Sequence, residues 1–138
     1  MARYPVGVAQ AAYLDSKEPN LGGIYENVVA QQLAAQKVAS FTTIRQKMRG
    51  EVDFVVDGPD GTAVPIEVKS GSYYHAHAAL GHVLDTAEYG VRLGIVFSRG
   101  NVERNGAVLY LPLYATWALS DVLGDSCAEG IKLEVKPV

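Results

Sequence analysis

Two short apolar runs joined by a tight turn constrain the fold more than any other feature of the chain. Residues 52–56 are VDFVV, residues 64–68 are VPIEV, and the turn sequence DGPDG occupies 57–61 between them. The first run places an apolar residue at every second position, 52, 54 and 56, with an acid between the first two, which is typical of a strand with one buried face. Together the runs predict an antiparallel hairpin, with Asp53 and Glu67 interrupting the apolar pattern.

Alternation predicts that the charged residues of both strands share a face of the sheet. Successive strand residues point to opposite faces. The apolar side chains of one face are Val52, Phe54, Val56, Val64, Ile66 and Val68. If these apolar faces are matched, Asp53, Glu67 and Lys69 project together from the other side.

A third acid lies on a predicted helix upstream. Residues 24–40, IYENVVAQQLAAQKVAS, carry apolar residues close to the 3.6-residue period of a helix. Val29 and Leu33 follow Glu26 at i+3 and i+7, so Glu26 falls on an otherwise apolar stripe. Buried, clustered carboxylates are costly and repel one another. A divalent cation relieves both costs, and carboxylate oxygens suit Mg²⁺ or Mn²⁺.

The remaining patterns predict an α/β domain with a mixed sheet flanked by helices. The expected elements are a strand at 41–48, a helix at 75–90, strands at 91–98 and 106–112, and a helix at 115–124. The first three strands should form an antiparallel meander, and the helix that follows should cross over to a further strand. We expect residues 1–20 to be a lead-in segment and 21–138 to be a single domain.

The amino-acid composition limits the cellular compartment of the protein and the kinds of molecule that it can bind. At 138 residues, with 49% hydrophobic and 20% charged residues, the chain fits one globular domain. A net charge of −3 excludes coating nucleic acid by bulk electrostatics, so any contact with DNA should be local. The lone Cys127 cannot form an internal disulfide, and neither a signal peptide nor a membrane-spanning run is visible. These features favour a cytoplasmic protein without membrane contact.

The acidic residues match a known motif. Glu26, then Asp53, thirteen intervening residues and Glu67-Val68-Lys69 resemble the metal site of the PD-(D/E)XK nuclease superfamily, whose core is restriction-endonuclease-like. The blocks GGIYENVVAQQL, EVDFVV, PIEVKSG and VLYLPLYA also resemble an uncharacterised C-terminal domain that follows an AAA-type ATPase module in bacteria and archaea. That resemblance spans roughly residues 20–115 and implies that the chain is a C-terminal fragment of a larger ATPase.

The resemblance also implies residue roles and a reaction. Glu26, Asp53 and Glu67 would hold one or two Mg²⁺ or Mn²⁺ ions, with the Val68 carbonyl as a further ligand. Lys69 would position water and stabilise charge on the scissile phosphate, so that Lys69, Glu67 and Asp53 form the catalytic set. The implied reaction is metal-assisted hydrolysis of phosphodiester bonds in DNA. The chain departs from some family branches, because Val52 replaces proline before the aspartate and the helix after the lysine lacks their Gln and Tyr.

Alternative interpretations accompany these expectations. The domain could be a catalytically inactive nuclease-fold module that binds nucleic acid or protein, or regulates the ATPase. Asp53, Glu67 and Lys69 could instead form a salt-bridge cluster on a solvated sheet face. For nucleic-acid contact, Arg45, Lys47 and Arg49 can line one face of a strand and Tyr73 can stack on a base. A solvated strand face for the basic residues and a core-edge position for the tyrosine are the favoured interpretations.

Overall fold

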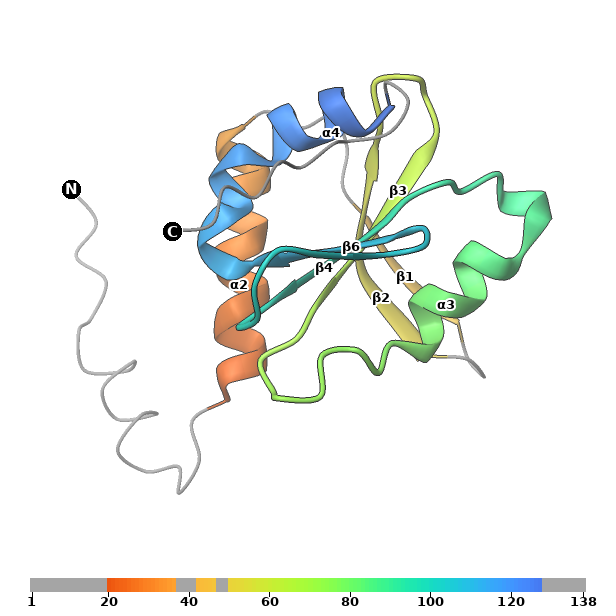
Figure 1. The fold of residues 1–138 in the computed structure, drawn as a ribbon. Helices are drawn as coiled ribbons and strands as arrows, with labels where there is room; N and C mark the ends of the chain where they lie inside the picture. Colours follow the sequence, from red (N-terminus) through yellow and green to blue (C-terminus); the bar gives the residue numbers. More distant parts are fainter. Residues whose placement is uncertain (1–19, 37–41, 47–49, 128–138) are drawn as a thin grey trace.

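A six-stranded mixed sheet with helices on both faces forms the framework of the domain (Figure 1). The computed structural model describes residues 20–36, 42–46 and 50–127. The helices are α2 (Leu21–Ala35), α3 (Ala78–Asp85) and α4 (Leu119–Cys127), with 3-10 turns η1 (Ala87–Tyr89) and η2 (Leu113–Ala118). The strands are β1 (Thr42–Gln46), β2 (Gly50–Asp57), β3 (Ala63–Val68), β4 (Gly94–Ser98), β5 (Glu103–Asn105) and β6 (Val108–Pro112).

The strand order β1-β2-β3-β4-β6-β5 combines antiparallel and parallel pairing. The first three strands pair antiparallel, as expected of a meander with short turns. The chain then passes through α3, and β4 pairs parallel with β3 and with β6. This arrangement confirms the predicted mixed sheet with a three-strand meander and flanking helices.

One face of the sheet packs against α2 and α4. Val29 and Leu33 of α2 are buried in the same core as Ile66 and Val68 of β3. In Figure 1, α2 and α4 lie together on one side of the sheet, and α3 lies on the other. The Asn20 side chain accepts a hydrogen bond from the Gly23 backbone N–H at 3.1 Å, which places the start of α2 at Leu21, before the predicted Ile24.

The opposite face is covered by α3. Leu80 of α3 is buried in a second, smaller cluster with Val96 and Tyr110. The helix approaches β4 closely, because a Cβ at Gly94 would lie only 2.8 Å from the Leu80 side chain. Every residue of β4 is therefore buried, as predicted for a strand covered on both faces.

Several elements differ from the sequence prediction. The helix expected at 75–90 is shorter, because it begins only at Ala78, after the non-helical His77, and ends at Asp85, before the extended backbone of Thr86. Gly90, with φ of 61°, ends η1 and does not end the α-helix. Strand β5 was not predicted, and a 3-10 turn precedes the final helix.

Candidate functional site

The Asp53 side chain lies where the backbone ladder between β2 and β3 ends. The last pairs at this end are Val55 with Pro65 and Phe54 with Ile66, so the next step brings Asp53 beside Glu67. There the Asp53 Oδ2 atom accepts a hydrogen bond from the Val68 backbone N–H at 2.7 Å. A side-chain oxygen therefore takes the place of a backbone acceptor, which ties the acid of one strand to the backbone of the next.

Glu67 is a buried carboxylate with only one of its oxygens satisfied. The residue is 6% exposed, and its Oε1 atom lies 2.5 Å from the Lys69 Nζ atom. Its Oε2 atom is buried without a hydrogen-bond partner, and no other buried side-chain nitrogen or oxygen of the described residues shares that condition. Because such an atom is costly, this geometry does not match a solvated salt-bridge cluster.

The electrostatic environment of Asp53 disfavours its ionised form. Burial raises the pKa of the Asp53 carboxyl to about 6 from an ordinary 3.8, although the Val68 hydrogen bond acts in the opposite direction. The neighbouring charges of Glu26 and Glu67 raise this pKa further, and that of Lys69 lowers it. A strongly perturbed carboxyl beside a specific set of charges is typical of functional sites.

Glu26 contributes to the site through its charge. Its side chain is exposed on α2, whereas Val29 and Leu33 of the same helix are buried. Glu26 is thus not aimed at the core as its place on the apolar stripe suggested. Its negative charge nevertheless adds to the raised pKa of the Asp53 carboxyl, of which burial is the largest cause.

The residues present fit a divalent cation at the Asp53–Glu67 pair. Both carboxylates supply hard oxygen donors, and the orphaned Glu67 Oε2 atom lacks the partner that an ion would provide. The N–H and C=O groups of one strand residue point the same way, so the Val68 carbonyl faces the side on which Asp53 binds the Val68 N–H. Across the described ranges, no three His, Cys, Asp or Glu side chains are grouped to hold an ion, so the structure does not assemble Glu26, Asp53 and Glu67 as the predicted set of three metal ligands.

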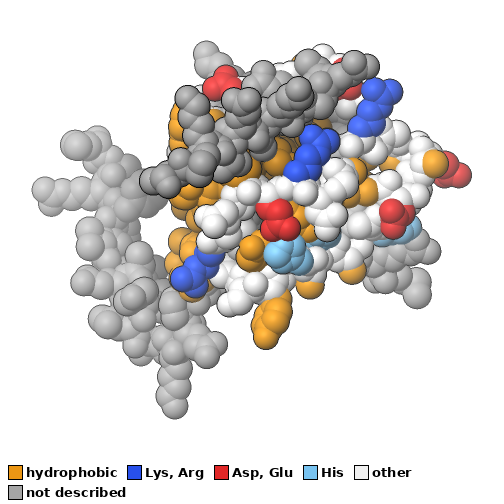
Figure 2. Space-filling model, viewed as in Figure 1, with side chains coloured by type: hydrophobic (Ala, Val, Ile, Leu, Met, Phe, Trp, Pro, Cys, Tyr) orange, Lys and Arg blue, Asp and Glu red, His pale blue; other side chains and the backbone are white. Residues whose placement is uncertain are grey.

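The residues predicted to contact nucleic acid are only partly described. Arg45 lies in β1, with its Cα paired to that of Glu51, and Tyr73 is 89% exposed. Lys47 and Arg49 lie outside the described residues. On the face shown in Figure 2, the coloured Lys and Arg side chains lie singly and form no continuous patch.

Arg99 is an exposed cation that sequence patterns did not single out. It follows the buried strand β4, and it reaches the neighbourhood of the loop after Lys69 only because β3 and β4 are parallel neighbours. The Lys69 N–H donates to the Phe97 carbonyl at 2.8 Å, which ties the two strand ends together. A signal for Arg99 would have required the strand order, which periodicity does not contain.

The comparisons with known proteins identify the family. None of the described helices is long and apolar enough to cross a membrane. No curated protein and no solved structure matches the chain. The model of the family described as "Domain of unknown function (DUF4143)" matches residues 21–115, which include α2, the carboxylate site and the sheet. The chain therefore belongs to the DUF4143 family.

Proposed function

We propose that this domain is a divalent-metal-dependent nuclease that hydrolyses phosphodiester bonds in DNA. The observation that carries the proposal is the buried Glu67 Oε2 atom, which lacks a partner beside the half-buried carboxyl of Asp53. The PD-(D/E)XK-like spacing of Glu26, Asp53, Glu67 and Lys69 supports it. The fold by itself does not indicate nuclease activity, because one fold can host many functions.

Asp53 and Glu67 would hold Mg²⁺ or Mn²⁺, with the Val68 carbonyl as a further oxygen donor and Glu26 adding negative charge. The bound ion supplies Lewis-acid polarisation of a phosphoryl oxygen and a more acidic water. Asp53 sits in surroundings that favour its protonated form, so a cation there would stabilise the carboxylate. The Val68 N–H holds Asp53 in place before any ligand arrives.

Lys69 supplies the positive charge of the site. Its side chain is 32% exposed and its ammonium contacts Glu67 Oε1, so it lies at the boundary between the buried carboxylate and solvent. From there it can donate hydrogen bonds to a phosphate oxygen or to an attacking water. Charge building up on the phosphate would be stabilised by this ammonium.

The companion predicted from the sequence is an AAA-type ATPase module in the same polypeptide. The family assignment supports this part of the proposal, because the blocks resembling the ATPase-associated domain lie within the matched residues 21–115. In this arrangement the ATPase would deliver DNA to the domain or control its access. Deleting the domain from an ATPase that carries it should then change ATP turnover in the presence of DNA.

Cleavage assays test the nuclease directly. Labelled single-stranded, duplex and branched DNA would be incubated with the wild type and Mg²⁺ or Mn²⁺. The variants Asp53→Ala and Lys69→Ala should lose cleavage while circular dichroism shows that they remain folded. Asp57→Ala is the matched control, because Asp57 is an exposed acid at the end of the same strand, away from Asp53.

Two outcomes would count against a nuclease. Cleavage that persists in both Asp53→Ala and Lys69→Ala would show that other residues, or a contaminant, perform the reaction. A wild type that binds DNA but cleaves none of the three substrates would favour the catalytically inactive binding module.

A further inference from the structure

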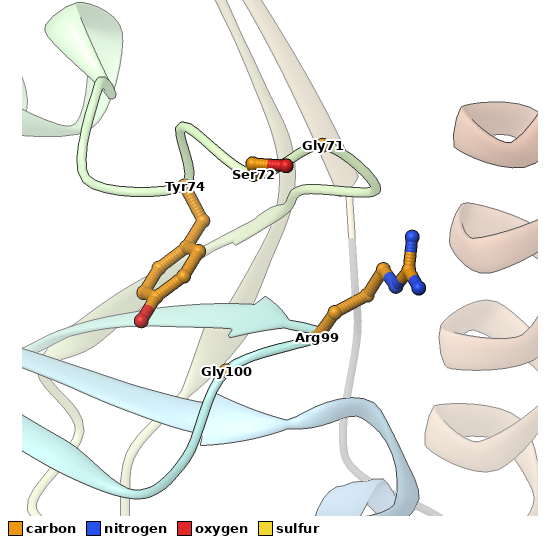
Figure 3. A pocket seen from close by; sticks show the side chains of 5 residues that line it. All are labelled: Gly71, Ser72, Tyr74, Arg99 and Gly100. Atoms are coloured by element: carbon orange, nitrogen blue, oxygen red, sulfur yellow. The ribbon is translucent and has the colours of Figure 1, made fainter.

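A pocket of about 320 Å³ lies between the loops that follow β3 and β4 (Figure 3). Its lining residues are Gly71, Ser72, Tyr74, Arg99 and Gly100, and we call it the Arg99 pocket. They come from two loops, one following β3 and the other following β4. Figure 3 shows Tyr74 descending toward Gly100 on one side, while the Arg99 side chain extends toward α2 on the other. The volume lies at the lower end of the range of small-ligand sites.

The pocket is adjacent in the chain to the proposed catalytic lysine. Gly71 follows Lys69 by two residues, which span at most about 7 Å of chain. Because β3 and β4 are parallel, both lining loops leave the sheet at the same edge. The carboxyl ends of parallel strands are where open α/β sheets bind ligands. The pocket therefore lies at the same edge of the sheet as Lys69.

Arg99 gives the pocket the chemistry of a phosphate site. It is exposed, and its guanidinium forms no hydrogen bond or ion pair with another residue that the structure describes. The backbone at Arg99 is held by a hydrogen bond between its two neighbours in the chain. The buried Ser98 hydroxyl accepts it from the Gly100 N–H at 3.0 Å. A guanidinium presents a rigid fork of donors that matches phosphate oxygens, and the exposed Ser72 hydroxyl adds a further donor.

The opposite wall is a tyrosine ring held by its neighbours. A Cβ at Gly100 would lie 2.6 Å from the Tyr74 ring and hydroxyl, so the ring rests directly on the glycine backbone. The Tyr74 ring centroid lies 4.2 Å from that of His75 and 5.9 Å from that of Tyr110. An aromatic wall fixed in this way can pack against a sugar or a base without a large loss of side-chain entropy.

We propose that the Arg99 pocket is a subsite for the DNA strand, in which Arg99 binds a phosphate next to the one at the carboxylate site. The Tyr74 ring contacts the nucleoside attached to that phosphate. This inference rests on the proposed nuclease function and adds a substrate-binding residue to it.

Binding of a fluorescein-labelled DNA oligonucleotide, followed by anisotropy in EDTA over a series of salt concentrations, tests the pocket without cleavage. Arg99→Ala should weaken binding roughly tenfold and lower the slope of log affinity against log salt by about 0.7 to 0.9. Arg99→Lys should retain part of the affinity. Arg92→Ala is the matched control, because Arg92 is an exposed arginine that precedes β4, at the opposite end of the strand. It should change neither quantity.

A second variant tests the aromatic wall. Gly100→Ala should weaken binding by displacing the Tyr74 ring, and a thermal melt would verify that the variant is folded. In cleavage assays, Arg99→Ala should raise KM with little change in kcat. This is expected because Arg99 would contact the DNA equally in the bound substrate and in the transition state.

The outcomes separate this proposal from the nuclease. Equal binding by Arg99→Ala and Arg92→Ala, or no DNA binding by the wild type, would overturn the pocket. Metal-dependent cleavage with an unchanged KM in Arg99→Ala would refute DNA binding at the Arg99 pocket and would still support nuclease activity. Arg99-dependent binding without cleavage under any metal would overturn the nuclease and support the pocket.

Discussion

Replacing Asp53 with asparagine should make the metal-free protein more stable at neutral pH. The wild-type carboxyl is ionised there although burial and the charges of Glu26 and Glu67 oppose ionisation. Asparagine resembles the protonated acid in shape, and its side-chain oxygen can still accept the hydrogen bond from Val68. The substitution therefore removes an unfavourable charge and keeps the local geometry.

The magnitude follows from the difference between the folded and unfolded pKa values of Asp53. The pKa is about 6 in the folded protein and 3.8 without the structural effects. A difference of about two pH units corresponds to about 3 kcal/mol, and the half-exposed position reduces this through solvent screening to about 1 to 2 kcal/mol.

The sign of the pH dependence is set by which state holds the proton. Between pH 3.8 and about 6 the unfolded chain has released the Asp53 proton while the folded protein keeps it. Wild-type stability from this group is therefore fully present below 3.8 and is lost as pH rises through about 6. The advantage of Asp53→Asn should appear over the same window and stay constant above it.

Urea denaturation followed by circular dichroism, in EDTA at several pH values, measures this difference. Added Mg²⁺ or Mn²⁺ should then make the wild type more stable than Asp53→Asn, because an ion that binds only the folded wild type raises its free energy of unfolding. Asp57→Asn, at the exposed end of the same strand, should show no such pH-dependent gain. If Asp53→Asn were equal to or less stable than the wild type at neutral pH in EDTA, the account of an electrostatically disfavoured carboxylate would be refuted.

Three further substitutions test the packing that positions the site. Leu33→Ala should lower the free energy of unfolding by about 2 to 5 kcal/mol in urea titrations, because Leu33 is 1% exposed between α2 and the sheet. Gly94→Ala should cost about 1 to 3 kcal/mol, since its Cβ would lie 2.8 Å from Leu80, and unchanged melting would contradict the close approach of α3. Tyr110→Phe removes the 2.6 Å hydrogen bond to His77 and should cost about 1 kcal/mol, measured by thermal melting against the wild type.

The meander and the parallel crossover could be predicted because their signals are local. Alternation in β2 gives the observed burial of Val52, Phe54 and Val56, with Asp53 and Val55 only partly buried. Burial on both faces likewise explains the continuous apolar run of β4. These elements follow from periodicity and turn chemistry, which a single sequence contains.

Elements set by long-range contacts could not be predicted in the same way. Strand β5 is fully exposed and polar, and it exists because it pairs with β6 across a turn at Gly106, whose φ is 58°. The segment before α3 is irregular, and there His75 contacts Glu103 at 3.0 Å. Neither contact leaves a periodic pattern in the chain.

Some features of the candidate site could likewise be predicted from local patterns, and others depend on long-range contacts. Alternation placed Asp53, Glu67 and Lys69 on one face of the hairpin, but it did not show that α3 covers this face, so the burial of Glu67 was not evident. The helical period placed Glu26 on the stripe that faces the core, whereas its side chain is exposed near the start of α2. Arg99 lies near the loop after Lys69 only because β4 is the parallel neighbour of β3.

Binding of a divalent cation by Asp53 and Glu67 underlies the proposed chemistry. Titration of Mn²⁺ into the metal-free domain, followed by calorimetry, tests it most directly, with Asp53→Asn and Glu67→Gln as site variants and Asp57→Asn as the control. We predict saturable binding to the wild type and to Asp57→Asn that is lost in both site variants. Equal binding by all four proteins, or no binding by the folded wild type, would contradict the account.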